Sequence, residues 1–153
     1  MSKDKFEQQM DKQIKNNDFN KFLAYFYQYL AENKTDPHNL VYYKTIALLY
    51  FLANEQYENY YALIQSCIDV ENYEYVMNVY DSINLCDFTR LDHLQNNADV
   101  SYKHLIQEIT QNIREKFNLL AKEVKLETNN KSIPSVQENN ILECLHVIDK
   151  FRK

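Results

Sequence analysis

Apolar residues recur along this chain at steps of three and four, the spacing that places them on one face of an α-helix. The pattern predicts a weak first helix through Phe6, Met10 and Ile14. A second helix is expected after Asn17 and Asp18, because these side chains accept hydrogen bonds from the free N–H groups at a helix start. The inward residues expected for this helix are Phe19, Phe22, Leu23, Phe26 and Leu30.

The pattern continues through five more segments. Asp36 and Pro37, a cap followed by a first-turn proline, predict a third helix that runs to about Ala53. Three shorter helices are expected over 57–67, 70–80 and 83–94, and Asp99 is expected to cap the longest helix, over 100–124. The apolar residues expected inside include Tyr43, Ile46, Tyr50, Phe51, Tyr60, Tyr61, Tyr73, Val76, Met77, Leu85, Leu91, Leu94, Ile106, Ile109, Ile113, Phe117, Leu120 and Ala121. Only 123–128 resembles a strand, with Val124 and Leu126 on one side.

A polar gap over 129–131 separates the last segment, 132–153, from the rest. Ser135 and Glu138 have the spacing of a capping box, which marks the start of a helix. An apolar stripe follows, formed by Ile141, Cys144, Ile148 and Phe151 and widened by Leu142, Leu145 and Val147. The pattern predicts a C-terminal amphipathic helix whose apolar side must be covered by other residues.

This succession of helices predicts an all-α fold of stacked helical hairpins, similar to a solenoid, with a separate C-terminal amphipathic helix. The expected divisions are a helical-repeat region over 1–98, a closing helix and residual segment over 99–128, and an assembly helix over 132–153. The repeat spacing is too loose for an array of consensus repeats.

The 153 residues include no glycine. Phosphate-cradling loops and dinucleotide-binding turns require glycine, so enzymes of those classes are excluded. Asparagine tolerates the left-handed backbone conformation and is expected to replace glycine at turns. The candidates are Asn33, Asn54, Asn84, Asn96 and Asn129. Codon bias of an AT-rich genome is an alternative explanation of this composition.

The net charge is −5, with acidic and basic residues interspersed. This distribution argues against nucleic-acid binding, which needs a concentrated basic face. The longest apolar runs are far shorter than a membrane span, and the charged N-terminus does not resemble a signal peptide. We expect a soluble intracellular protein with no nucleic-acid or membrane partner.

Residues that carry chemistry are scattered. The histidines, His38, His93, His104 and His146, have no metal-ligand spacing, and Cys67, Cys86 and Cys144 are expected to be small buried hydrophobes. The tyrosine clusters lack interleaved basic residues and are expected to pack between helices, with their hydroxyls reaching water or backbone. We therefore expect no catalytic residue, metal, cofactor or small-molecule substrate. A thiol or metal site around Cys86, His93 and His104 is the remote alternative.

Two stretches carry a family resemblance. The run YKTIALLYFLANEQYENYYALIQ (43–65) and the later DVSYKHLIQEITQNIREKF (99–117) resemble the helical-repeat portion of the small PCI-type non-ATPase subunit of the 26S proteasome regulatory lid. This family comprises the twelfth non-ATPase subunit, the eighth signalosome subunit and subunit k of translation initiation factor three. The terminal SIPS (132–135) followed by an amphipathic helix is similar to the tail of the same family. The winged-helix module that the family carries is reduced here to 119–131.

The resemblance implies a non-catalytic scaffold subunit of the lid, located in cytoplasm and nucleus, whose partners are other lid subunits. It further implies that the C-terminal helix enters a bundle of partner helices. The bundle-facing residues would be Ile141, Cys144, Leu145, Ile148 and Phe151. The alternative function is a free-standing helical-repeat adaptor that holds a partner protein or peptide in its groove.

Overall fold

The computed structural model describes residues 3–32, 38–67 and 69–128, and this part of the chain consists of helices and turns without a strand. The elements in chain order are α1 (Lys3–Lys15), α2 (Phe19–Glu32), α3 (His38–Ala53), α4 (Tyr57–Gln65), the short 3-10 helix η1 (Val70–Tyr73), α5 (Glu74–Asn84), α6 (Phe88–Asn96) and α7 (Lys103–Thr128). The all-α class is confirmed. The solenoid-like stacking and the three-part division stay predictions.

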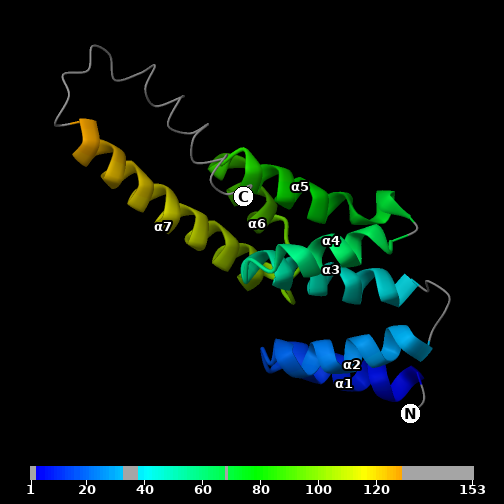
Figure 1. Cartoon of the computed structure of the whole chain (residues 1–153). Helices are drawn as coiled ribbons and strands as arrows, with labels where there is room; N and C mark the ends of the chain where they lie inside the picture. The colour runs from blue at the N-terminus through cyan, green and yellow to red at the C-terminus, as the bar shows by residue number, and fades with distance from the viewer. Residues whose placement is uncertain (1–2, 33–37, 68, 129–153) are drawn as a thin grey trace.

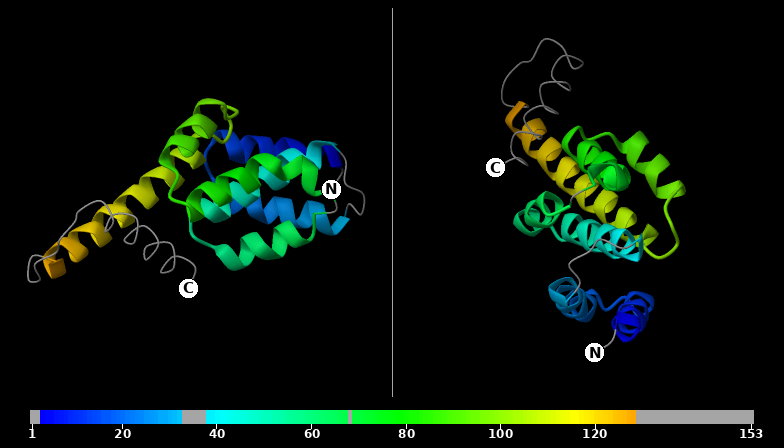
Figure 2. Two further views of the ribbon diagram at one scale, coloured as in Figure 1. Left: turned by 90° about the horizontal axis from the view of Figure 1, so that it is seen from above. Right: turned by 90° about the vertical axis from the view of Figure 1, so that its right-hand side faces the viewer.

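Helix α3 occupies the centre of the molecule, with the α1–α2 hairpin on one side and α4, α5 and α6 on the other (Figures 1 and 2). Its consecutive residues Ile46, Ala47, Leu48 and Leu49 are all completely buried. Because successive residues of a helix point in different directions, a helix buried on every side must be apolar all round. The sequence of α3 meets this condition over 46–53, and its neighbours cover the rest of the core.

One type of turn joins the helices of three pairs: α1 to α2, α3 to α4 and α5 to α6. In each turn one residue is left-handed: Asn17 (φ 56°), Glu55 (φ 59°) and Cys86 (φ 51°). The following residue donates its N–H to the carbonyl five residues back: Asp18 to Gln13 (2.9 Å), Gln56 to Phe51 (2.8 Å) and Asp87 to Ser82 (2.9 Å). These bonds form the Schellman motif that ends many helices. Each turn then leads into an aromatic residue: Phe19, Tyr57 or Phe88.

The prediction that asparagines replace glycine at turns is wrong at each of the three candidate positions that the structure describes, and an asparagine takes the left-handed position in only one of these three turns. Asn17 is left-handed, although it had been expected as part of a cap, while Asn54, Asn84 and Asn96 have ordinary negative φ. The left-handed position is the second residue after the last residue of each helix, and packing of the helix decides where the helix ends. Glu55 and Cys86 therefore take this position. Asn33 and Asn129 lie outside the described residues.

We predict that Cys86→Gly stabilises the protein by about 0.5–1 kcal/mol. A left-handed residue with a Cβ costs about 1–2 kcal/mol, and the extra freedom of glycine in the unfolded chain offsets part of the gain. Urea titration followed by circular dichroism measures the change. The matched control is Ser66→Gly, because Ser66 ends α4 with φ −77° and glycine is expected to destabilise there. Destabilisation by both substitutions would contradict the interpretation.

Several expected boundaries and core positions are wrong. Helix α5 runs to Asn84 and α6 begins at Phe88, so Ile83 belongs to α5 and the exposed Leu85 lies in the turn. Met77 and Tyr61 are also exposed, because α5 and α4 each bury only one narrow face. By contrast, Asp18 caps α2 as expected, accepting from the N–H of Lys21 (3.2 Å). The Asp36–Pro37 start lies outside the described residues.

The strand-like interpretation of 123–128 is wrong, because α7 continues as a helix to Thr128. Val124 follows Leu120 and Ala121 at steps of four and three, so it extends the helical stripe. The start of α7 also differs from the prediction. Asp99 accepts from the N–H and the hydroxyl of Ser101 (3.0 and 2.7 Å), and this turn delays the regular helix until Lys103.

Candidate functional site

The five residues predicted to bind a partner, Ile141, Cys144, Leu145, Ile148 and Phe151, lie outside the described residues. Their role stays a prediction. The described residue range ends with α7, the helix to which this predicted segment is connected. The candidate surface is therefore the part of α7 that leads toward the segment.

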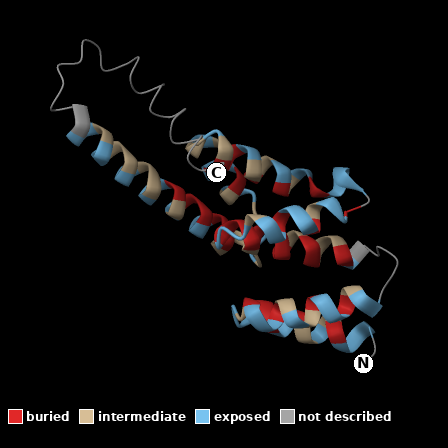
Figure 3. Cartoon of the chain, in the orientation of Figure 1, coloured by how far each residue is buried: buried red, intermediate tan, exposed pale blue. Residues whose placement is uncertain are grey.

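Helix α7 has a buried half and a projecting half (Figures 1 and 3). In the first half, Leu105, Ile106, Ile109 and Ile113 are buried in the core. No residue from 114 to 126 is buried. The projecting half starts at residue 114, and 15 residues of helix from there to Thr128 span about 22 Å. It is defined here as the distal half of α7.

The distal half continues the apolar stripe of the buried half. Phe117, Leu120, Ala121 and Val124 share one helical face at steps of three, one and three, and all four are half-buried. Leu119 and Leu126 point to the opposite face and are 62% and 69% exposed. A stripe of this kind normally faces a hydrophobic core. Here it extends beyond the buried core of the described residues.

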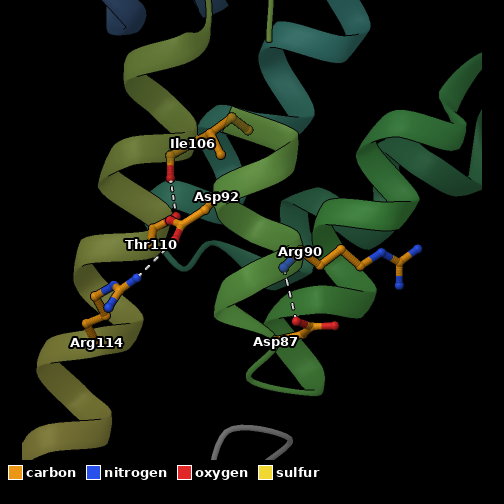
Figure 4. A network of polar contacts seen from close by, with 6 residues as sticks. All are labelled: Asp87, Arg90, Asp92, Ile106, Thr110 and Arg114. Carbon is orange, nitrogen blue, oxygen red and sulfur yellow. Dashed lines mark hydrogen bonds and ion pairs between the residues drawn. The ribbon is translucent and has the colours of Figure 1, made fainter. Parts of the chain in front are cut away.

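Contacts at the junction hold α7 in place where it leaves the body. The guanidinium of Arg114 lies 4.8 Å from the ring centre of Phe88. It also forms an ion pair with Asp92 (3.4 Å; Figure 4). The ring of Phe88 meets that of Phe117 edge to face, with 5.9 Å between centres. Lys116 pairs with Glu55. Both ion pairs are substantially exposed, so each contributes little by itself and the aromatic contact dominates.

Two local hydrogen bonds shape the helices at this junction (Figure 4). Asp87 caps α6 by accepting from the N–H of Arg90 (3.0 Å). Thr110 donates its hydroxyl to the carbonyl of Ile106 (2.9 Å), which satisfies a buried hydroxyl within α7. Asn112 donates to the carbonyl of Ala53 (3.0 Å), tying α7 to the end of α3. The direction of the distal half is therefore fixed by the body.

A second feature is a cleft of about 630 Å³ between α1, α3 and the start of α7. Its lining includes Asp11, Tyr42, Tyr43, Ser101 and His104. Tyr43 donates its hydroxyl to Asp11 (2.9 Å), and burial followed by this hydrogen bond raises the pKa of Tyr43. The Ser101 hydroxyl donates to Asp99 (2.7 Å), so this potential nucleophile is not directed at His104. The arrangement suits binding of a polar group better than acid–base chemistry.

The ring of His104 packs 5.5 Å from that of Phe19, between centres. Its Nε2 is buried and has no hydrogen-bond partner among the described residues.

Comparisons with protein-family models, curated proteins and solved structures find no match to this chain. The evidence on function is therefore the geometry and the sequence resemblance.

The alternative thiol or metal site is not assembled. Cys86 lies in the α5–α6 turn, His93 bonds to Asn97 on α6, and His104 packs on α2. Within 3–32, 38–67 and 69–128, no group of three His, Cys, Asp or Glu residues is placed to hold a metal ion. Among these residues, no helix is both long enough and apolar enough to cross a membrane.

Sequence reasoning expected Phe117, Leu120 and Ala121 inside the core and did not identify the distal half as a surface. Periodicity cannot make this distinction, because the stripe looks the same on both sides of Ile113. One signal for this surface was present in the sequence. The apolar stripe continues through Val124 almost to the polar gap, and a second apolar stripe follows within 135–151.

Proposed function

We propose that this protein is a non-catalytic scaffold subunit of the proteasome regulatory lid, attached through its C-terminal helix in a bundle of helices from several subunits. The observation that carries the proposal is the apolar stripe of α7, which continues from the last buried residue, Ile113, to Val124, about 16 Å farther toward the C-terminal segment. An apolar stripe that continues past the buried core is the kind of surface through which helices associate. The sequence resemblance supplies the identity of the assembly.

In this function the helical body holds the C-terminal helix at a distance from the core. The partners are other lid subunits, and the places of action are the cytoplasm and the nucleus. Burial of the stripe residues would contribute about 1.5–3 kcal/mol for each large side chain, before the entropy of ordering is subtracted. A few such residues are sufficient to attach a subunit.

Deletion of 135–153 tests the proposal. We expect the body from α1 to α6 to keep its unfolding free energy, while the shortened protein elutes alone, at less than its full 18.4 kDa, instead of with a large assembly in native extract. Removal of only Arg152 and Lys153 is the control, because it leaves the apolar stripe intact. Continued elution of the 135–153 deletion with the assembly would refute attachment through the C-terminal helix.

The second candidate is a free-standing adaptor, and the polar cleft beside Tyr43 and His104 favours it. In that case the C-terminal segment completes the protein's own core. The same deletion then lowers the unfolding free energy of the body, including α1–α6, without any change in the size of a complex. Size-exclusion of native extract separates the two functions, because an adaptor of this kind elutes independently of a megadalton assembly.

A further inference from the structure

The distal half of α7 is a helix without a buried side chain from 114 to 126. The distal half continues a helix whose first half is packed in the core, so its nucleation is already achieved, but most helical stability in proteins comes from packing of an apolar face, and no buried side chain supplies it here. The stripe of Phe117, Leu120, Ala121 and Val124 is only half-buried and leaves apolar surface in contact with water. Both features favour a covering element along the stripe.

We propose that segment 135–151 folds back on the distal half of α7 as an antiparallel helix, pairing its own apolar stripe with that of α7. The inference goes beyond the proposed function, because it concerns the chain before any partner binds. The six residues 129–134 make the connection, a length typical between antiparallel helices in bundles.

The two stripes match in register. Steps of three, one and three separate Phe117, Leu120, Ala121 and Val124, and the same steps separate Ile141, Cys144, Leu145 and Ile148. An antiparallel arrangement centred between Ser132 and Ile133 therefore opposes all four pairs at once: Val124 with Ile141, Ala121 with Cys144, Leu120 with Leu145, and Phe117 with Ile148. The small Ala121–Cys144 pair lets the helices approach within the usual 8–10 Å between axes.

Charge and connectivity favour the same occupant. The opposed ranges are 114–127, with four basic and three acidic residues, and 138–151, with one basic and three acidic residues, so their net charges are opposite in sign. A second copy of the chain would have to bind from solution. A segment joined by a short connection has an effective concentration in the millimolar range, which exceeds that of a second copy at ordinary protein concentrations.

The hairpin leaves room for a partner. The apolar side of 135–151 is widened by Leu142 and Val147, and one helix cannot cover all of it. In an assembly, partner helices would pack on this remaining surface and on Phe151, so the hairpin would enter the bundle as a unit. Ile141, Cys144, Leu145 and Ile148, which the sequence resemblance assigns to the bundle, would then face α7 instead of a partner. The free chain and the assembled subunit then share the same α7 contact.

Disulfide cross-linking of the purified full chain tests the register. In a Cys86→Ser background, Ala121→Cys places a thiol opposite Cys144, and Lys122→Cys places it one residue away on another face. We expect oxidation to join Ala121→Cys to Cys144 within one chain at least tenfold faster than Lys122→Cys. Equal rates, the absence of a cross-link, or disulfide-linked dimers, which would indicate a second copy as occupant, would each overturn the proposal.

Hydrogen exchange provides a measurement that needs no new thiol. Ile148→Asp is expected to accelerate amide exchange at least tenfold over 118–126 and to leave 105–113 unchanged. Asn139→Asp, which adds the same charge on the polar side, is the control. Unchanged exchange over 118–126 in Ile148→Asp would overturn the hairpin. These results are independent of partner subunits, so a chain that passes both tests but elutes alone contradicts only the proposed function.

Discussion

Phe22→Ala is expected to lower the unfolding free energy by about 3–5 kcal/mol, the usual cost of deleting a large buried aromatic side chain. Phe22 is 0% exposed on α2. Its ring stacks on Phe26 with 5.7 Å between centres and lies 6.4 Å from the rings of both Phe19 and Tyr43. The cavity left by alanine would border all three rings, and helices held from both sides cannot collapse to fill it.

The ring of Phe22 belongs to the seam that holds the α1–α2 hairpin to the rest of the molecule. On either side of it, Phe19 stacks on Tyr50 (5.2 Å between ring centres) and Tyr29 meets Tyr43 edge to face (6.3 Å). Aromatic pairs of this kind contribute about 0.5–1.5 kcal/mol beyond the area that they bury. A defect at Phe22 is therefore expected to loosen the hairpin as a unit.

Thermal and urea unfolding followed by circular dichroism measure the effect, with an expected fall in Tm of about 6–20 °C for a domain of this size. The matched control is Tyr27→Ala, an aromatic of the same helix that is 48% exposed and is expected to cost less than about 1 kcal/mol. Equal losses in the two variants would show that the α1–α2 hairpin does not depend on this seam.

Local patterns predicted most helices and failed where tertiary contacts decide. Asp18 could be assigned as a cap because capping depends on neighbouring backbone groups. The α5–α6 turn could not be placed, because apolar Leu85 continues the pattern while the left-handed conformation falls on Cys86, a residue type without preference for it. The sequence thus reports periodicity well and helix ends poorly.

The candidate surface, the distal half of α7, was likewise predictable in its periodicity but not in its exposure. The periodicity of α7 was predictable, whereas the end of its burial at Ile113 depends on where α3 and α6 stop beside it.

Hydrogen bonds between residues far apart in the sequence were also beyond local reasoning. Tyrosine hydroxyls were expected to reach water or backbone, and Tyr75 does donate to the carbonyl of Leu94 (2.7 Å), but Tyr29 and Tyr43 donate to Glu7 and Asp11.

These tyrosines predict cooperative unfolding in alkali. Burial, and then the hydrogen bond with Glu7, raises the pKa of Tyr29 from 10 to about 12, and burial also raises the pKa of Tyr43 and Tyr60. Below pH 10 all three are neutral in both states, so their contribution to stability is fully present. As pH rises above 10, the unfolded chain loses these protons while the folded chain retains them, and stability falls.

Each tyrosine that ionises only on unfolding lowers the unfolding free energy by about 1.4 kcal/mol per pH unit above 10. These three tyrosines alone remove about 4 kcal/mol per pH unit, against a total stability of about 5–15 kcal/mol for a typical domain, and Tyr75, whose pKa burial also raises, adds to the loss. We expect a sharp midpoint at about pH 11–12. Phenolate absorbance and loss of helical circular dichroism should rise together, whereas gradual ionisation near pH 10 with the helices intact would contradict the prediction.

Tyr60→Phe isolates one member of this set. Its ring stacks on Tyr80 with 5.1 Å between centres, and phenylalanine keeps that contact. The variant has one proton fewer to lose on unfolding, so the fall of stability above pH 10 should become shallower by about 1.4 kcal/mol per pH unit, and the midpoint should move to higher pH. At pH 7, where the phenol is neutral in both states, we expect a change within about 1 kcal/mol. An unchanged alkaline slope would mean that Tyr60 ionises while the protein is still folded, and that its burial does not protect the hydroxyl.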